Sequence, residues 1–187
     1  ATCMVATLLF ATAASAQDTI KIGLVNEATG PNAEAGIYTV NGARLALEEI
    51  NAAGGVLGKK VELKLEDNQS TNPGTVLAFS KLFGEKNIVA IIGPIRSTQT
   101  QAASPTIAKA GVPVAVGGTD PSLTKVNNRW LFRARPSDSY SSRVIADFGV
   151  NTLQKKKWAI IHSTDAFGAG GMNALVAALK AQGITPV

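Results

Sequence analysis

Small polar residues follow several predicted strands of this 187-residue chain, and they are the residues best suited to binding chemistry. Ser97 opens a predicted helix soon after the apolar run at residues 88–92. Gly117 and Thr119 follow the next apolar run, and a polar loop at residues 163–167 follows a later one. The carboxyl ends of parallel strands bind ligands, and a helix N-terminus favours an anion such as a carboxylate. Two interpretations of Ser97 stay open here: it meets such an anion, or it only caps its helix.

Motifs that would indicate an enzyme or a metal site are incomplete. The segment at residues 54–60 resembles a phosphate-binding loop but lacks its first glycine and has Lys60 in place of the magnesium-binding Ser or Thr, which indicates a helix-to-strand turn. His162 is the single histidine and has no second metal ligand nearby, which favours a structural role. Asp120 and Asp165 follow strands, where aspartates usually form turns. Donors and acceptors without a nucleophile–base pair indicate binding without catalysis, and no cofactor is expected.

The composition is that of an ordinary globular protein, with 45% hydrophobic residues, 17% charged residues and a formal net charge of +5. A positive charge could indicate an acidic partner such as nucleic acid. However, the densest basic cluster, residues 155–157, falls at the end of a predicted helix, where cations complement the helix dipole. No nucleic-acid partner is therefore expected.

The first residues have the pattern of a secretory signal peptide, although an initiator Met and a basic segment are missing, so the sequence is expected to begin inside it. A short apolar run at residues 4–11 precedes small residues at 14–16, which predicts residues 1–16 as the peptide and cleavage before Gln17. Cys3 would leave with it, so no disulfide and no cysteine-based metal site is expected in the mature chain. The pattern predicts a secreted protein, most simply a periplasmic one.

Strands and helices alternate along the chain and would position the polar residues. Apolar patterns predict strands at residues 19–25, 61–66, 88–92, 112–116 and 130–133, and helices at residues 38–52, 72–84 and 97–110. A second series is predicted as helix 139–153, strand 158–162, loop 163–169, helix 170–182 and the start of a strand at 184–187. This alternation indicates βαβ units and a parallel sheet, which is an α/β fold.

Three local features of these elements carry more specific expectations. The β-branched run at residues 88–92 predicts a strand that is buried on both faces. Asn72 is expected to cap the second helix, with proline at its first helical position. Pro105 either kinks the third helix or separates two short helices.

Six segments resemble a known family in their order and spacing: IKIGLVNEATGP, NGARLALEEINAAGGVLGKKVEL, EDNQSTNP, IIGPIRSTQT, AGVPVAVGGTDPSLT and AIIHSTDAFGAGG. They are similar to the substrate-binding proteins of branched-chain amino-acid ABC transporters, which are type I periplasmic binding proteins of the leucine/isoleucine/valine-binding class. The resemblance implies two Rossmann-like lobes that close on a ligand. It divides the chain into a first lobe at residues 17–134 and the beginning of a truncated second lobe at residues 135–187.

The resemblance also implies roles for individual residues. Ser97 would offer its hydroxyl to the ligand carboxylate, and Gly117 would offer its carbonyl to the ligand amino group. Thr119 would offer both its backbone N–H and its hydroxyl, and Phe167 would be the aromatic wall that closes over the ligand. The family's acidic partner for the ammonium group would lie in the missing part of the second lobe.

Gly118 completes the expected site, and two positions depart from the family pattern. Ala35 stands where many members have an aromatic residue, and Phe167 replaces a commoner tyrosine. The space at Ala35 predicts a pocket that admits a bulkier or differently shaped solute than leucine.

The expected function is that of a monomeric periplasmic protein that captures a small amino acid, branched-chain or related, and delivers it to a membrane ABC permease. Two alternatives stay open. The same fold could bind another solute, such as an aromatic acid or a small amide, or it could act as a sensory ligand-binding domain.

Overall fold

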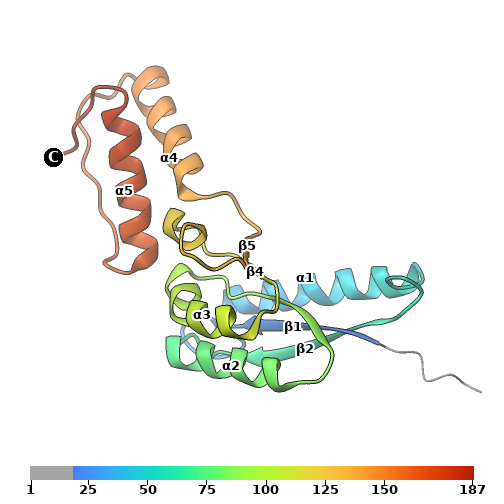
Figure 1. The fold of residues 1–187 in the computed structure, drawn as a ribbon. Helices are drawn as coiled ribbons and strands as arrows, with labels where there is room; N and C mark the ends of the chain where they lie inside the picture. Colours follow the sequence, from blue (N-terminus) through green and yellow to red (C-terminus); the bar gives the residue numbers. More distant parts are fainter. Residues whose placement is uncertain (1–18) are drawn as a thin grey trace, which may run out of the picture.

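A parallel β-sheet forms the first part of the molecule (Figure 1). The computed structural model describes residues 19–187, so the predicted signal peptide, with Cys3, lies outside the described residues. The strands are β1 (Ile20–Asn26), β2 (Val61–Asp67), β3 (Ile88–Ile92), β4 (Val114–Val116) and β5 (Leu131–Arg133). They form one five-stranded sheet in the order β2-β1-β3-β4-β5, and every neighbouring pair is parallel. The predicted α/β fold with a parallel sheet is confirmed.

Three helices connect the first four strands: α1 (Ala33–Ala52), α2 (Asn72–Gly84) and α3 (Ser97–Ala110). α2 and α3 pack against each other on one side of the sheet, and α1 lies on the other side (Figure 1). The turn between α1 and β2 includes Gly54 and Gly55, both at positive φ, so the segment at residues 54–60 is a helix-to-strand turn as predicted. The arrangement brings the carboxyl ends of β3 and β4 next to the start of α3.

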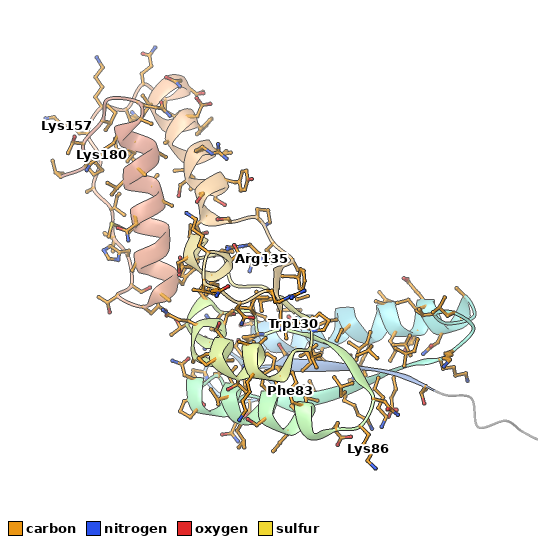
Figure 2. All side chains as sticks on the ribbon, viewed as in Figure 1. Phe83, Lys86, Trp130, Arg135, Lys157 and Lys180 are labelled. Atoms are coloured by element: carbon orange, nitrogen blue, oxygen red, sulfur yellow. The ribbon has the colours of Figure 1, made fainter. Side chains whose placement is uncertain are left out.

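The hydrophobic core lies between the sheet and the α2–α3 layer. Its buried side chains come from both layers: Val25, Ala78, Phe79, Leu82, Ile91, Ala103, Ile107, Val114, Val116 and Leu131. Phe83 and Trp130 pack against the edge of this core (Figure 2). The sheet and two helices therefore share one continuous apolar interior.

The prediction that β3 is buried on both faces is wrong. Ile91 is fully buried, whereas Val89 is 51% exposed and Ile92 is 40% exposed. Successive side chains of a strand point to opposite faces, so Ile92 faces away from the side that Ile91 uses. On α1 only Gly36 and Val40 are buried, so this helix covers little of the second face.

Beyond β5 the chain forms a helical pair that projects away from the sheet (Figure 1). A 3₁₀ helix at Pro121–Thr124 precedes β5. After β5 comes α4 (Asp138–Asp147), which continues as a π-helical turn at Phe148–Thr152. α5 (Ala166–Lys180) packs against α4 around buried Ala146, Ala178 and Leu179. This pair falls within residues 135–187, the part of the chain predicted to begin a second lobe.

The two strands predicted in this second part do not form. Residues 158–162 and 184–187 have no strand conformation, and one backbone hydrogen bond, from Val187 N to Trp158 O at 2.9 Å, joins the two segments. The apolar alternation is still visible, since Ile160 packs against the small helical core while Ile161 is fully exposed. Alternation reports which side chains face a core, but a strand also needs a ladder of hydrogen bonds with a neighbour.

Several helix ends differ from their predicted positions. α1 begins at Ala33, five residues before the predicted residue 38, and thereby includes Ala35. Thr71, not Asn72, caps α2 by accepting a hydrogen bond from Gly74 N at 3.0 Å. Pro105 neither breaks α3 nor separates two helices, because α3 runs continuously and Pro105 is exposed.

Within residues 19–187, no helix is both long and apolar enough to cross a membrane.

Two leucines of α2 give a matched test of where the core lies. Leu82 is 1% exposed, whereas Leu77 is 57% exposed. Leu82→Ala should lower the free energy of unfolding by about 2–5 kcal/mol, because it removes buried methyl groups and leaves a cavity. Leu77→Ala should change it by less than about 0.5 kcal/mol. Equal losses in chemical denaturation would contradict the assignment of this core.

Amide hydrogen exchange tests the difference between the strand that forms and the strand that does not. In and after β3, Ile91 N donates to Pro113 O at 3.0 Å and Gly93 N donates to Ala115 O at 2.8 Å. No amide of residues 158–162 donates a hydrogen bond within the described part of the chain. The β3 amides should therefore exchange slowly and those of residues 158–162 quickly. Comparable protection of both segments would show that a second sheet forms.

Candidate functional site

The polar residues expected at the site do come together at the carboxyl ends of β3 and β4. A cavity of about 200 Å³ lies there. It is lined by Ile95, Arg96, Ser97, Thr98, Gly117, Thr119, Arg135, Asp165 and Phe167. Gly118 is buried beside this cavity but does not line it, and Ala35 is an exposed residue of the first turn of α1, away from the cavity lining.

Ser97 is held by the turn that follows β4. Its Oγ accepts hydrogen bonds from Thr119 N at 3.1 Å and from Asp120 N at 3.2 Å, and the residue is 1% exposed. The N-cap of α3 is Arg96, without a side-chain cap, so the interpretation of Ser97 as a cap is wrong. A hydroxyl has one hydrogen and two acceptor positions. Both acceptor positions are filled here, and no acceptor for the hydrogen lies within the described part of the chain.

Thr119 connects the site to the second part of the molecule. Its hydroxyl donates to Asp138 Oδ2 at 3.0 Å, in the first turn of α4. Its carbonyl accepts from Asp138 N at 2.9 Å and from Arg133 Nη1 at 2.6 Å. A movement of α4 relative to the sheet would therefore change the hydrogen bonds of Thr119 directly.

Asp165 and Phe167 bring α5 to the cavity. Asp165 caps α5: its Oδ1 accepts from Gly168 N at 2.9 Å and from Ser163 Oγ at 2.7 Å. The bond from Gly168, followed by that from Ser163, holds the pKa of Asp165 below its usual value. Thr98 Oγ1 donates to Asp165 Oδ2 at 3.4 Å and links α3 to α5. Phe167 belongs to the first turn of α5, not to the predicted loop, and the residue is 55% exposed.

In the described part of the chain, the side chains of Asp120 and His162 make hydrogen bonds only with residues close to them in sequence. Asp120 accepts hydrogen bonds from Ser122 N at 3.0 Å and from Ser122 Oγ at 2.6 Å, as a turn-forming aspartate does. His162 is exposed, and its Nδ1 lies 2.8 Å from Ser163 O. Among residues 19–187, no cluster of three His, Cys, Asp or Glu side chains could hold a metal ion.

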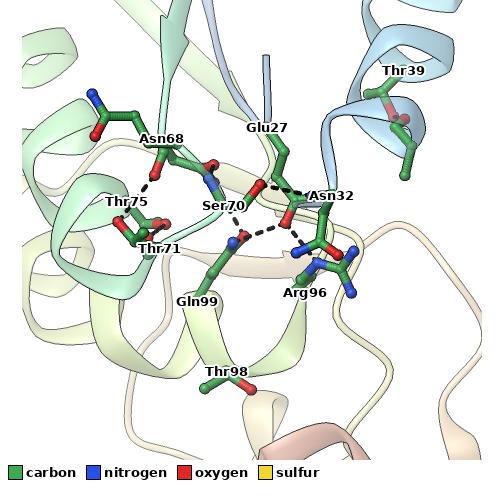
Figure 3. A network of polar contacts seen from close by, with 12 residues as sticks. Glu27, Asn32, Thr39, Asn68, Ser70, Thr71, Thr75, Arg96, Thr98 and Gln99 are labelled. Carbon is green, nitrogen blue, oxygen red and sulfur yellow. Dashed lines mark hydrogen bonds and ion pairs between the residues drawn. The ribbon is translucent and has the colours of Figure 1, made fainter. Parts of the chain in front are cut away.

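A buried polar network supports the start of α3 and was not predicted from the sequence (Figure 3). Glu27 follows β1 and is fully buried. Its Oε1 accepts from Arg96 Nε at 2.6 Å and from Gln99 Nε2 at 2.9 Å. Gln99 Oε1 in turn accepts from Asn68 Nδ2 at 3.1 Å. One carboxylate therefore holds the residues on both sides of Ser97.

The sequence does carry a signal for this network. Asn26 and Glu27 end an apolar strand, and Asn68 follows the neighbouring strand at the same edge of the sheet. Charged and amide side chains are rarely fully buried without partners, so polar residues at these positions indicate a network. Within the described residues, Asn26 Oδ1 and Glu27 Oε2 are buried without a hydrogen-bond partner.

A double-mutant comparison tests the pairing of Glu27 with Arg96. Arg96→Met leaves the buried carboxylate without its cation and should lower the free energy of unfolding by on the order of 2–3 kcal/mol, discounted because Arg96 is partly exposed. Adding Glu27→Gln should recover most of this loss, because no buried charge then remains. Lys81→Met provides a control: it removes the exposed ion pair with Glu66 at 3.2 Å and should cost less than about 1 kcal/mol. A double variant as unstable as Arg96→Met would contradict the pairing.

Comparisons with known proteins show which family the chain resembles. The family model described as "Periplasmic binding protein" matches residues 19–187. The Leu/Ile/Val-binding protein BraC3 of Rhizobium johnstonii is 37% identical over 185 residues, which is 98% of this chain and 50% of that protein. The chain thus spans about half the length of the curated relatives it matches.

Two solved structures are similar over most of the described chain. One is the branched-chain amino acid transporter substrate binding protein LivJ from Streptococcus pneumoniae, in complex with isoleucine. It is 31% identical, with a TM-score of 0.80, and the match covers 91% of this chain and 48% of the LivJ chain. The other is a solute binding protein of an ABC transporter from Rhodopseudomonas palustris, in complex with 3,4-dihydroxy benzoic acid. It is 25% identical, with a TM-score of 0.80, and the match covers 90% of this chain and 46% of that protein. Both likenesses agree with the parallel-sheet fold. Because the family model matches residues 19–187, the chain belongs to the periplasmic binding protein family.

Proposed function

We propose that this chain supplies the first lobe, and the beginning of the second, of a periplasmic solute-binding protein. The protein captures a small amino acid between its lobes and delivers it to the permease of an ABC transporter. The hydroxyl of Ser97 is the observation that carries this proposal, because it lies at the cavity with its acceptor positions filled and its hydrogen unused.

A carboxylate is the chemical group that suits this position best. The first N–H groups of a helix have no partner within the helix, and they favour an anion. At α3 no side chain caps these groups. A ligand carboxylate could accept from the Ser97 hydroxyl and from this helix start together, and hydrogen bonds to a charged group are the stronger kind.

Other residues of the same cavity can make the remaining contacts with an amino-acid ligand. The carbonyl of Gly117 accepts no hydrogen bond within the described part of the chain, so it can accept one from a ligand ammonium group. Phe167 presents an exposed aromatic ring at the cavity and can cover an apolar ligand side chain. Relatives whose names include leucine, isoleucine and valine binding support an amino acid as the ligand.

Closure between the two parts provides a mechanism for transport. Ser97 and Gly117 belong to the sheet side of the cavity, whereas Asp165 and Phe167 come from the α5 side. A ligand that contacts both sides favours the closed state over the open one, and a permease can distinguish these states. The hydrogen bonds between Thr119 and Asp138 lie at the junction of the two parts.

An aromatic acid is the second candidate ligand. The Ser97 site reads a carboxylate and does not itself require an amino group. The similar protein from Rhodopseudomonas palustris was solved in complex with 3,4-dihydroxy benzoic acid. The ring of Phe167 could stack on such a ligand.

Titration calorimetry on Ser97 variants tests the proposal. The probes are L-leucine, L-isoleucine, L-valine, L-phenylalanine and benzoate. Ser97→Ala should weaken the best of them about 10–100-fold, the worth of a hydrogen bond to a charged group. It should also lower the free energy of unfolding by about 1–3 kcal/mol, because the buried N–H of Asp120 and the partly buried N–H of Thr119 lose their acceptor.

Two further variants separate binding from stability. Ser97→Thr keeps the hydroxyl and should recover both quantities. Ser80→Ala changes an exposed serine of α2 and should alter neither. Unchanged affinity in Ser97→Ala, together with lowered stability, would show that Ser97 has a structural role alone.

A further inference from the structure

We propose that Arg96 and Arg135 form a subsite for a second anionic group, so that the solute is an acidic amino acid or a related dicarboxylate. This inference rests on the proposed solute-binding role of the cavity and adds the class of ligand. The two arginines come from different elements, one directly before α3 and one after β5, and both line the cavity.

Arg135 is an exposed cation without a protein counterion. It lies where the chain passes from the sheet to α4 (Figure 2). Within residues 19–187 its guanidinium has no hydrogen bond and no ion pair. Its neighbour Arg133, by contrast, donates to the carbonyl of Thr119 at 2.6 Å and to Thr124 Oγ1 at 3.1 Å. Arg133 therefore has a structural role, and Arg135 remains available to a ligand.

A hydrogen bond at one edge of the Arg96 guanidinium fixes the orientation of this group. Nε donates to the buried carboxylate of Glu27 at 2.6 Å, as Figure 3 shows. The two Nη groups have no partner within the described part of the chain, and the side chain is 43% exposed. Because the guanidinium is planar and its Nε edge is held, the Nη pair is pre-oriented for a carboxylate.

Asp165, the acid in the cavity lining, forms no ion pair with either arginine in the described part of the chain, although the positive charge of Arg96 helps to lower the pKa of Asp165. Both oxygens of Asp165 already accept hydrogen bonds, from Gly168 N, Ser163 Oγ and Thr98 Oγ1. The first carboxylate of a ligand is already served by Ser97 and the start of α3. An apolar ligand side chain placed against the two arginines would remove their free N–H groups from water without replacing those hydrogen bonds, which is costly. A second carboxylate would supply those bonds.

Pairs of probes that differ in one charge provide the test. The protein is titrated with L-glutamate against L-glutamine, with L-aspartate against L-asparagine, and with L-leucine. The acidic member of at least one pair should bind about tenfold more tightly or better, as expected for one additional charge-assisted hydrogen bond. This preference should decrease as salt concentration rises.

Variants assign the preference to the two arginines. Arg135→Met should reduce the acid-to-amide affinity ratio about tenfold or more while leaving the affinity for the amide within about twofold. For Arg96 the double variant Glu27→Gln/Arg96→Met is used, so that no buried carboxylate is left unpaired. Arg44→Met, an exposed change on α1 with the same loss of charge, should leave the ratio unchanged.

The outcomes separate this inference from the proposed function. Binding of leucine or of the amides at least as tight as that of the acids would overturn the subsite and leave the solute-binding role intact. An acid preference that survives both arginine variants would overturn the assignment to Arg96 and Arg135. Absence of binding by every amino acid, glutamate and aspartate included, would overturn the inference and the amino-acid proposal together.

Discussion

Two hydrogen bonds to the hydroxyl of Ser97, from Thr119 N and Asp120 N, join the first turn of α3 to the turn after β4. This connection fixes the centre of the site. It positions the uncapped start of α3 beside the Gly117 carbonyl, and it leaves the hydroxyl hydrogen as a donor for the cavity. The same turn reaches Asp138 through Thr119, so a contact made at Ser97 lies two hydrogen bonds away from the junction with α4.

A buried charge stabilises this arrangement from the other side of α3. Glu27 holds both Arg96 and Gln99, the neighbours of Ser97 in the first helical turn. A buried carboxylate contributes little net stability by itself, because its desolvation offsets much of the attraction to its partner. Its value here is positional: it sets where α3 begins and which edge of Arg96 faces the cavity. The geometry of this edge of the sheet thus depends on polar contacts between segments that are distant in sequence.

The sequence was sufficient to predict the parallel sheet and three cavity residues that follow its strands: Ser97, Gly117 and Thr119. Phe167 was expected at the cavity only from the family resemblance, because the strand predicted before it does not form. Parallel strands place their following loops at one edge, so positions after strands can be predicted without knowing any contact. Contacts between distant residues could not be predicted in this way. Glu27 and Arg96 are separated by 69 positions, and no local pattern pairs them.

The two failed strand predictions have the same origin. Alternation at residues 158–162 predicts a strand but does not specify a neighbouring strand for it to pair with. The apolar run at β3 predicts burial on both faces but does not specify how much of the second face α1 covers.

A high-resolution crystal structure of the protein with its tightest-binding carboxylate compound tests the central claim most directly. The account predicts a ligand carboxylate oxygen within hydrogen-bond distance of Ser97 Oγ and of a backbone N–H in the first turn of α3. It also predicts that Thr119 N and Asp120 N remain next to the same hydroxyl. A ligand bound elsewhere, or a carboxylate held without any contact to Ser97 or the start of α3, would contradict the account.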